Sequence, residues 1–406
     1  MSKQKRIYIQ LILIITTLSC NLSTNEPVNF KIRFSTWGSL PFSKELLENT
    51  DNQKILYAIR NNPKDYLEIS TETSIPEDSI VQFIKRLSQL DLVVLDLPSD
   101  IKWKAKIPIY NERELNLAET ICLEYAKGEV DIIRNSIDEI QKLYNSLSIS
   151  SHFEWDSMSW IIIGALICDL AVIDRVRFFT EYRDERYLPQ LHPDGKRWSL
   201  RGYLNLNEVR YKERKWSFSQ AWIKDETAGL AVFGYYKPDI KRKKPPKNPL
   251  YLAITDYGDI LFNINNKAMS LESIREKTEI HPDTLENRID YLISLDPPAI
   301  RKENNTYLSA IPIFPKDDFK RLLLLADRIA SRIHLDITIP CSDELEIEGK
   351  KAGLTYSLPD GVLIRDIVLK LLVDEGILPD LPNPPTPWNF GVWGWEGPLL
   401  LWEDVK

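Results

Sequence analysis

The residue types that most often carry catalysis or bind metals are few in this chain and widely spaced. The four histidines, His152, His192, His281 and His334, lie far apart, and none has a neighbour at metal-ligand spacing. The chain contains no His-Glu-x-x-His segment, nucleophile elbow, phosphate-binding loop or dinucleotide fingerprint. We therefore expect a protein that binds without catalysing, and that needs neither a cofactor nor a metal ion.

Side chains suited to binding another macromolecule concentrate in two predicted helices and one hairpin. The helix predicted over 78–90 and the hairpin after it place six donors at outward positions: Gln82, Lys85, Arg86, Gln89, Lys102 and Lys104. Such donors can hold phosphates and base edges, or the acidic groups of a protein. The helix predicted over 284–295 offers Asn287 and Arg288, but Glu286 and Asp290 beside them would repel phosphate.

Tryptophans cluster near the C-terminus, between Trp388 and Trp402. Trp393 and Trp395 could form a platform for sugar rings or for a partner peptide. They could equally fold back and cap the core, with one polar edge exposed to water. The sequence leaves both interpretations open.

The first twenty residues form a separate segment. Lys3, Lys5 and Arg6 precede an apolar run, 7–18, that is shorter than the roughly 20 residues needed to span a bilayer. The run ends just before Cys20 and resembles the signal peptide of bacterial lipoproteins, although Thr17 stands where that family prefers Leu. The resemblance implies lipidation at Cys20 and a membrane-anchored, extracytoplasmic chain. The alternative is an N-terminal core or anchor helix with a coincidental cysteine.

The composition is that of an ordinary globular protein. At 406 residues the chain is long enough for two to four domains, and its 27% charged and 43% hydrophobic residues exclude a disordered or collagen-like protein. The net charge of −7 gives no overall attraction to nucleic acid. Beyond Cys20, three cysteines remain in apolar runs, Cys122, Cys168 and Cys341. An odd number excludes a complete disulfide framework, so we expect them to be buried thiols.

An internal repeat underlies the body of the chain. Shifted by 205 residues, 55–91 lies on 260–296 without a gap, and the agreement is mostly at apolar positions. Further along, 161–170 parallels 362–371 at a shift of 201. Because the matched positions are apolar, the repeated feature is a core, and the chain is predicted to contain two related halves.

Each copy is predicted to run helix, helix, turn, helix, hairpin, helix. In the second copy Asp283 is placed to cap the third helix, and 303–305 forms the hairpin turn. With the run 270–280 followed by 283–289, this order resembles the winged helix-turn-helix fold of bacterial transcription regulators. The resemblance covers about 60 residues of each copy and implies DNA binding or protein docking, since the fold serves both.

We therefore predict an α+β fold with two tandem winged-helix units, each followed by a helical or β-rich extension. The predicted order is a lipoprotein-type signal peptide (1–20), a polar tether (21–34), winged-helix unit 1 (35–111), a helical and β-rich extension (112–236), a basic Pro-rich linker (237–249), winged-helix unit 2 (250–335) and a shorter extension with the Trp-rich tail (336–406).

The sequence favours a non-enzymatic, lipid-anchored protein of the bacterial cell envelope whose winged-helix units bind a protein or glycan partner. Positive residues before an apolar segment stay in the cytoplasm and send the following chain outward, which conflicts with DNA binding. The alternative hypothesis is a cytoplasmic winged helix-turn-helix transcriptional regulator that binds nucleic acid.

Overall fold

The structure is a computed structural model in which helices predominate and four small sheets accompany them, which confirms the α+β class. It describes residues 30–37, 40–96, 101–173, 192, 193, 195, 199–204, 216–224, 228–235, 256–264, 267–278, 280–295, 298–359, 362–379 and 392–396. Cys20 and the predicted linker 237–249 lie outside these residues. The chain forms two compact units, the first from 1–111 with 198–205 and the second from 112–197 with 206–406.

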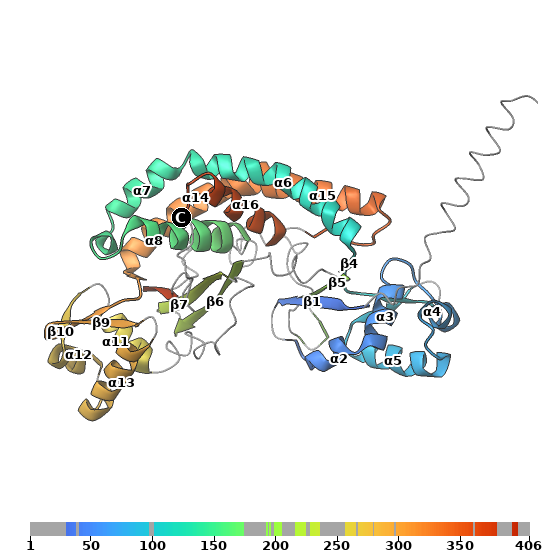
Figure 1. The fold of residues 1–406 in the computed structure, drawn as a ribbon, viewed down its shortest axis with the longest axis horizontal. Coiled ribbons are helices and arrows are strands. Elements are labelled where there is room, and N and C mark those ends of the chain that lie inside the picture. The colour runs from blue at the N-terminus through green and yellow to red at the C-terminus, as the bar shows by residue number, and fades with distance from the viewer. Residues whose placement is uncertain are drawn as a thin grey trace, which may run out of the picture. The chain divides into compact units, whose positions relative to one another are not determined.

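The first unit is a small helical bundle with a hairpin and a three-stranded sheet (Figure 1). Its elements are β1 (Ile32–Trp37), α2 (Lys44–Glu48), α3 (Thr50–Ala58), α4 (Tyr66–Thr73), α5 (Glu77–Gln89), β2 (Val93–Leu95), β3 (Trp103–Ala105), β4 (Ile109–Tyr110) and β5 (Ser199–Leu204). Strand β5 comes from the segment 112–236, which was predicted to form the extension after this unit.

Local hydrogen bonds define where α3 and α4 begin and end. The Asn49 side chain accepts a bond from the Asn52 N–H, and Asp65 and Glu68 form a reciprocal capping box at the start of α4. Ser74 then adopts a left-handed conformation, with φ of 59°. These features stop α4, and α5 starts within a few residues.

The core of the first unit forms around one face of α5. Ile80, Ile84 and Leu87 recur at helical spacing and are fully buried, together with Ile55 of α3 and Ile69 of α4. Each such side chain contributes about 1.5–3 kcal/mol when it is completely buried. The opposite face of α5 is thereby left to solvent.

The sheet of the first unit has the order β1–β5–β4, antiparallel between β1 and β5 and parallel between β5 and β4. The buried Gln53 side chain accepts from the Ile32 N–H at 2.8 Å and donates to the Ile32 carbonyl, which fixes β1 to α3. The Gly202 N–H donates to the Pro108 carbonyl at 2.9 Å. A Cβ atom at Gly202 would lie 2.8 Å from Ile32, so this close strand crossing requires glycine.

The second unit contains a second small module and a long helical core. Its elements are α6 (Glu112–Arg134), α7 (Ile137–Asn145), η1 (Ser148–Ser151), α8 (Trp155–Ser159), η2 (Trp160–Ile173), β6 (Trp216–Lys224), β7 (Ala228–Tyr235), α11 (Asp256–Asn263), β8 (Met269–Ser270), α12 (Leu271–Thr278), α13 (Pro282–Ser294), β9 (Ile300–Glu303), β10 (Thr306–Ser309), β11 (Ile313–Phe314), α14 (Lys316–Ile333), η5 (His334–Thr338), α15 (Ile339–Lys351), α16 (Val362–Asp374) and β12 (Val392–Glu396).

The module from α11 to β11 contains three helices and a hairpin in the predicted order, together with the strands β8 and β11, which were not predicted. The predicted stripe of Leu285, Ile289 and Leu292 on α13 is buried, and Asn304 takes a left-handed conformation in the predicted hairpin turn. The prediction that Asp283 caps α13 was wrong, because the helix begins at Pro282, two residues before the predicted start, and His281 is its N-cap residue. Proline suits the first helical position because its missing N–H would have no partner there.

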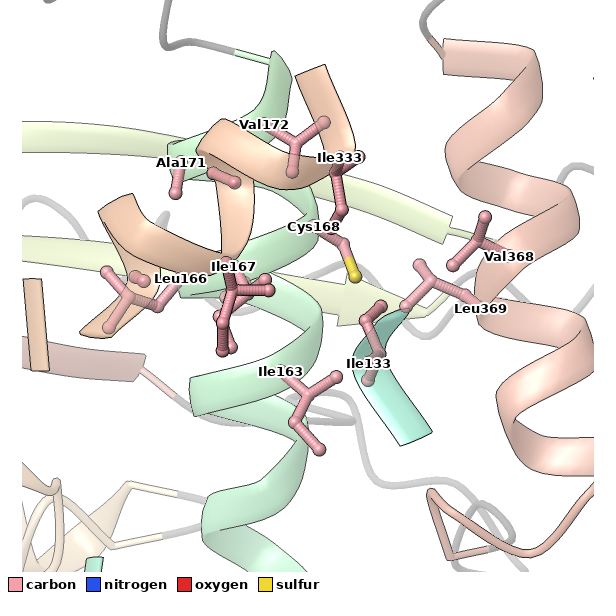
Figure 2. Close-up of a cluster of buried hydrophobic side chains, with 14 of the residues drawn as sticks. Ile133, Ile163, Leu166, Ile167, Cys168, Ala171, Val172, Ile333, Val368 and Leu369 are labelled. Atoms are coloured by element: carbon pink, nitrogen blue, oxygen red, sulfur yellow. The ribbon is translucent and has the colours of Figure 1, made fainter. Parts of the chain in front are cut away.

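The helical core pairs segments that are distant in the sequence. Helix α6 packs against α16, and α14 packs against η2, which is wound as a π-helix (Figure 1). Figure 2 shows Ile163, Ile167 and Cys168 of η2 in one cluster with Ile133, Ile333, Val368 and Leu369, from α6, α14 and α16. Each long helix therefore buries its apolar face against a helix from the other half of the chain.

The sheet of the second unit has the order β11–β12–β7–β6. Strand β12 is parallel to β11 and antiparallel to β7, and the Gly394 N–H donates to the Pro312 carbonyl at 2.9 Å. Strand β7 had been assigned to the first half, before the linker at 237–249. The structure places it in one sheet with β11 and β12.

Candidate binding surfaces

The exposed face of α5 brings together four of the predicted binding residues. Gln82, Lys85, Arg86 and Gln89 are all exposed, on the side opposite the buried stripe. Within the described part of the chain, neither Lys85 nor Arg86 forms an ion pair. These two cations are therefore available to an external partner.

The two predicted lysines of the first hairpin are less available. Lys102 Nζ lies 3.1 Å from a Glu68 carboxylate oxygen. The backbone N–H of Asp65 and the ammonium of Lys102 hold the pKa of Glu68 below its usual value. Lys104 is half-buried. The hairpin thus presents less free positive charge than its sequence suggests.

On α13 the two predicted donors are used within the chain. The Asn287 side-chain amide donates to the Asp283 carbonyl at 2.7 Å, and the Arg288 guanidinium lies 5.8 Å from the centre of the Tyr257 ring. Glu286 and Asp290 are exposed. The face that α13 offers to a partner is therefore acidic.

An exposed apolar edge on the first hairpin was not predicted. Val94 and Leu95 of β2 are 44% and 37% exposed, and β2 pairs only with β3 among the described strands. Leu67 and Ile101 are each 64% exposed and adjoin the ion-paired Glu68 and Lys102. We call these four residues, Leu67, Val94, Leu95 and Ile101, the wing patch.

The edge strand of the hairpin in the second module is protected by charge. Strand β9 exposes Arg301, Lys302 and Glu303, as edge strands usually do to prevent unwanted pairing. Val93–Leu95 carries no charge, and comparing the two hairpins residue by residue would have found this difference in the sequence.

The two central tryptophans of the tail lie in the core and form no surface platform. Trp393 and Trp395 are 2% and 0% exposed, and the Trp395 ring stacks on Phe319 with centroids 5.3 Å apart. A Cβ atom at Gly229 would lie 2.1 Å from the indole of Trp395, so the neighbouring strand has no room for a side chain there. Both rings cap the core, and their faces are covered.

A cluster of ionisable residues lies buried in the helical core, and the sequence analysis missed it. Arg365 of α16 donates to Asp169 of η2 at 2.7 Å, and it also contacts Asp366. Burial opposes the charge of Arg365, yet the two carboxylates hold its pKa above the usual value. Glu129 of α6 is only 2% exposed, and burial raises its pKa to about 8.

The chemistry of this buried cluster is that of a structural ion pair. Burial, and then the neighbouring Glu129, raise the pKa of the Cys168 thiol well above its usual value. A thiol that holds its proton is a poor nucleophile. All three body cysteines are buried and free, as predicted. Across the described residues, no group of three or more His, Cys, Asp and Glu side chains is placed to hold a metal ion.

One described segment, Trp155–Val172, is apolar and long enough to cross a membrane, but most of it is buried inside the protein. Its side chains contact α14 and α16 in the helical core. We therefore assign it to the core.

Comparisons of the chain with models of known families, with curated proteins and with solved structures gave no match.

Glu129 predicts a specific dependence of stability on pH. The pKa of this carboxyl is raised from 4.5 to about 8, so between these values the folded chain holds a proton that the unfolded chain releases. Stability should fall as pH rises through this window, by at most about 1.4 kcal/mol per pH unit, and then level off. In Glu129→Gln, which does not ionise, urea unfolding should lose this slope.

Glu124→Gln is the matched control, because Glu124 lies on the same helix with its side chain 70% exposed. The control should keep the slope of the original chain between about pH 5 and about pH 8. An unchanged slope in Glu129→Gln would contradict the assignment of the proton to Glu129.

Proposed function

We propose that the chain is a duplicated, non-enzymatic binding protein in which two winged-helix modules are joined to a shared helical core. The element order supports duplication, since α3, α4, α5, β2 and β3 match α11, α12, α13, β9 and β10 in sequence. Helices α4 and α12 begin 205 residues apart, as do α5 and α13. This is the shift at which the apolar residues of the sequence align.

Hydrogen bonds at corresponding positions also support duplication. The Leu92 N–H donates to the Leu87 carbonyl in the first module, and the Ala299 N–H donates to the Leu292 carbonyl in the second. Gly202 and Gly394 each donate to the carbonyl of the proline that precedes the adjacent parallel strand. On this basis β5 corresponds to β12 and β1 corresponds to β7.

The observation that carries the binding function is the wing patch. Each hairpin begins with one buried residue, Val93 in the first module and Ile300 in the second. The next two residues are exposed in both hairpins, so Val94 and Leu95 correspond to Arg301 and Lys302. An unprotected edge strand can accept an added strand, whose backbone supplies affinity and whose alternate side chains supply specificity. The partner is thus a protein segment in extended conformation with apolar side chains.

The surfaces argue against the alternative of a DNA-binding regulator. A pair of recognition helices on one duplex would bring Glu286 and Asp290 of α13 close to phosphate, where carboxylates are repelled. Lys102, the lysine nearest the tip of the first hairpin, is ion-paired to Glu68. Nanomolar, steeply salt-dependent binding of a defined duplex that Lys85→Glu with Arg86→Glu abolishes would reverse this conclusion.

The proposed location follows from the N-terminal sequence. The apolar run 7–18 and Cys20 support a lipid anchor that holds the body outside the cytoplasm. A tethered protein that captures an extended segment of an envelope protein needs no catalytic residue.

Peptide capture at the wing patch can be tested with a phage-displayed library of random peptides. Selection on the purified chain should enrich sequences with alternating apolar residues. Their affinity should fall at least about tenfold in Val94→Arg with Leu95→Lys, because these residues add charge to the edge strand. Fluorescence anisotropy with a labelled peptide measures the effect.

The matched control is Arg301→Ala with Lys302→Ala, which alters the same positions of the second hairpin and should leave peptide affinity unchanged. Selection that enriches no extended apolar sequence, or equal affinity for the two variants, would contradict the proposal.

The anchor is tested by labelling cells with radioactive palmitate. The chain should incorporate label and sediment with membranes, and Cys20→Ala should lose both properties because the acceptor thiol is gone. Cys341→Ala serves as the control, since that buried thiol should not be acylated. An unlabelled, full-length chain in the cytosol would contradict the anchor.

A further inference from the structure

The exposed faces of the third helices of the two modules carry different charges. At the shift of 205 residues, Lys85 of α5 corresponds to Asp290 of α13, and both are exposed. Val81, which is uncharged, corresponds to Glu286, and both are exposed. The C-terminal half of the exposed α5 face thus carries cations, whereas the α13 face carries carboxylates.

The four charges that this contact would use have no ion-pair partner within the described residues. No ion pair of the described chain involves Lys85, Arg86, Glu286 or Asp290. Two faces whose charges have the same sign repel each other, whereas two faces of opposite charge attract each other. We propose that the α5 face of one copy of this chain binds the α13 face of a second copy.

The distribution of charge along each helix predicts an antiparallel contact. On α5 the acidic residues Glu77 and Asp78 lie in the first turn, while Lys85 and Arg86 lie in the last two turns. On α13 the carboxylates of Asp283, Glu286 and Asp290 lie from the first turn to the middle, and Ser294 ends the helix. The antiparallel arrangement places cations on carboxylates and keeps the acidic turn of α5 away from them.

This contact uses different residues from the wing patch and does not depend on peptide binding. Exposed ion pairs are individually weak and screened by salt, so the association should be weak and salt-sensitive in solution. Tethering copies to one membrane raises their effective concentration and strengthens such contacts. Because each copy carries both faces, two copies can bind reciprocally, or successive copies can form a chain.

The test uses two charge-reversal variants of the full chain in mild detergent. Lys85→Glu with Arg86→Glu makes both faces acidic, and Glu286→Lys with Asp290→Lys makes both faces basic. In sedimentation velocity at low salt the original chain should associate, and its dissociation constant should rise at least about tenfold at about 300 mM salt. Each variant alone should be monomeric.

Mixing the two variants in equal amounts should restore association, because every acidic face then meets a basic one. Lys142→Glu with Lys370→Glu changes the net charge equally, at exposed positions elsewhere, and should associate like the original chain. Melting curves establish that each variant is folded. A monomeric original chain at low salt, self-association of either variant, or a mixture that stays monomeric would overturn the proposal.

Discussion

The fold depends on a crosswise packing of long helices. Helix α6 buries its apolar face against α16, and α14 buries its face against η2, so that each half of the sequence supplies the partner of the other. The Arg365–Asp169 ion pair joins η2 and α16 inside this core. Removing either partner would leave a charge unpartnered in an apolar core, which is costly, so the pair links these two helices. The strands β5 and β12 follow these helices in the sequence.

The surfaces of the two modules differ. Their buried stripes are equivalent, yet the exposed positions carry different chemistry. The first module offers apolar residues on its hairpin edge and cations on α5, while the second offers charge on β9 and carboxylates on α13. Two modules whose exposed residues differ in this way can bind two kinds of surface.

The spacing of apolar residues predicts which face of a helix or strand is buried, but it does not predict contacts between residues that are distant in the sequence. The spacing of Leu285, Ile289 and Leu292 reports that one face of α13 is buried, and the structure agrees. Periodicity does not say which helix covers that face, so the crosswise core was not foreseen. The apolar run Val93–Leu95 predicts a buried strand, although two of its three side chains are exposed. The ion pair that occupies Lys102 likewise depends on contacts distant in sequence.

The most direct test of the crosswise packing is to cleave the chain between its two proposed copies and to measure whether the pieces stay associated. A protease recognition sequence inserted within 205–215, between β5 and β6, separates α6 and η2 from α14 and α16 without removing any described element. The crosswise packing predicts that the two pieces migrate together in size-exclusion chromatography and unfold in one transition. Pieces that separate in native buffer, each keeping its helical content, would contradict it.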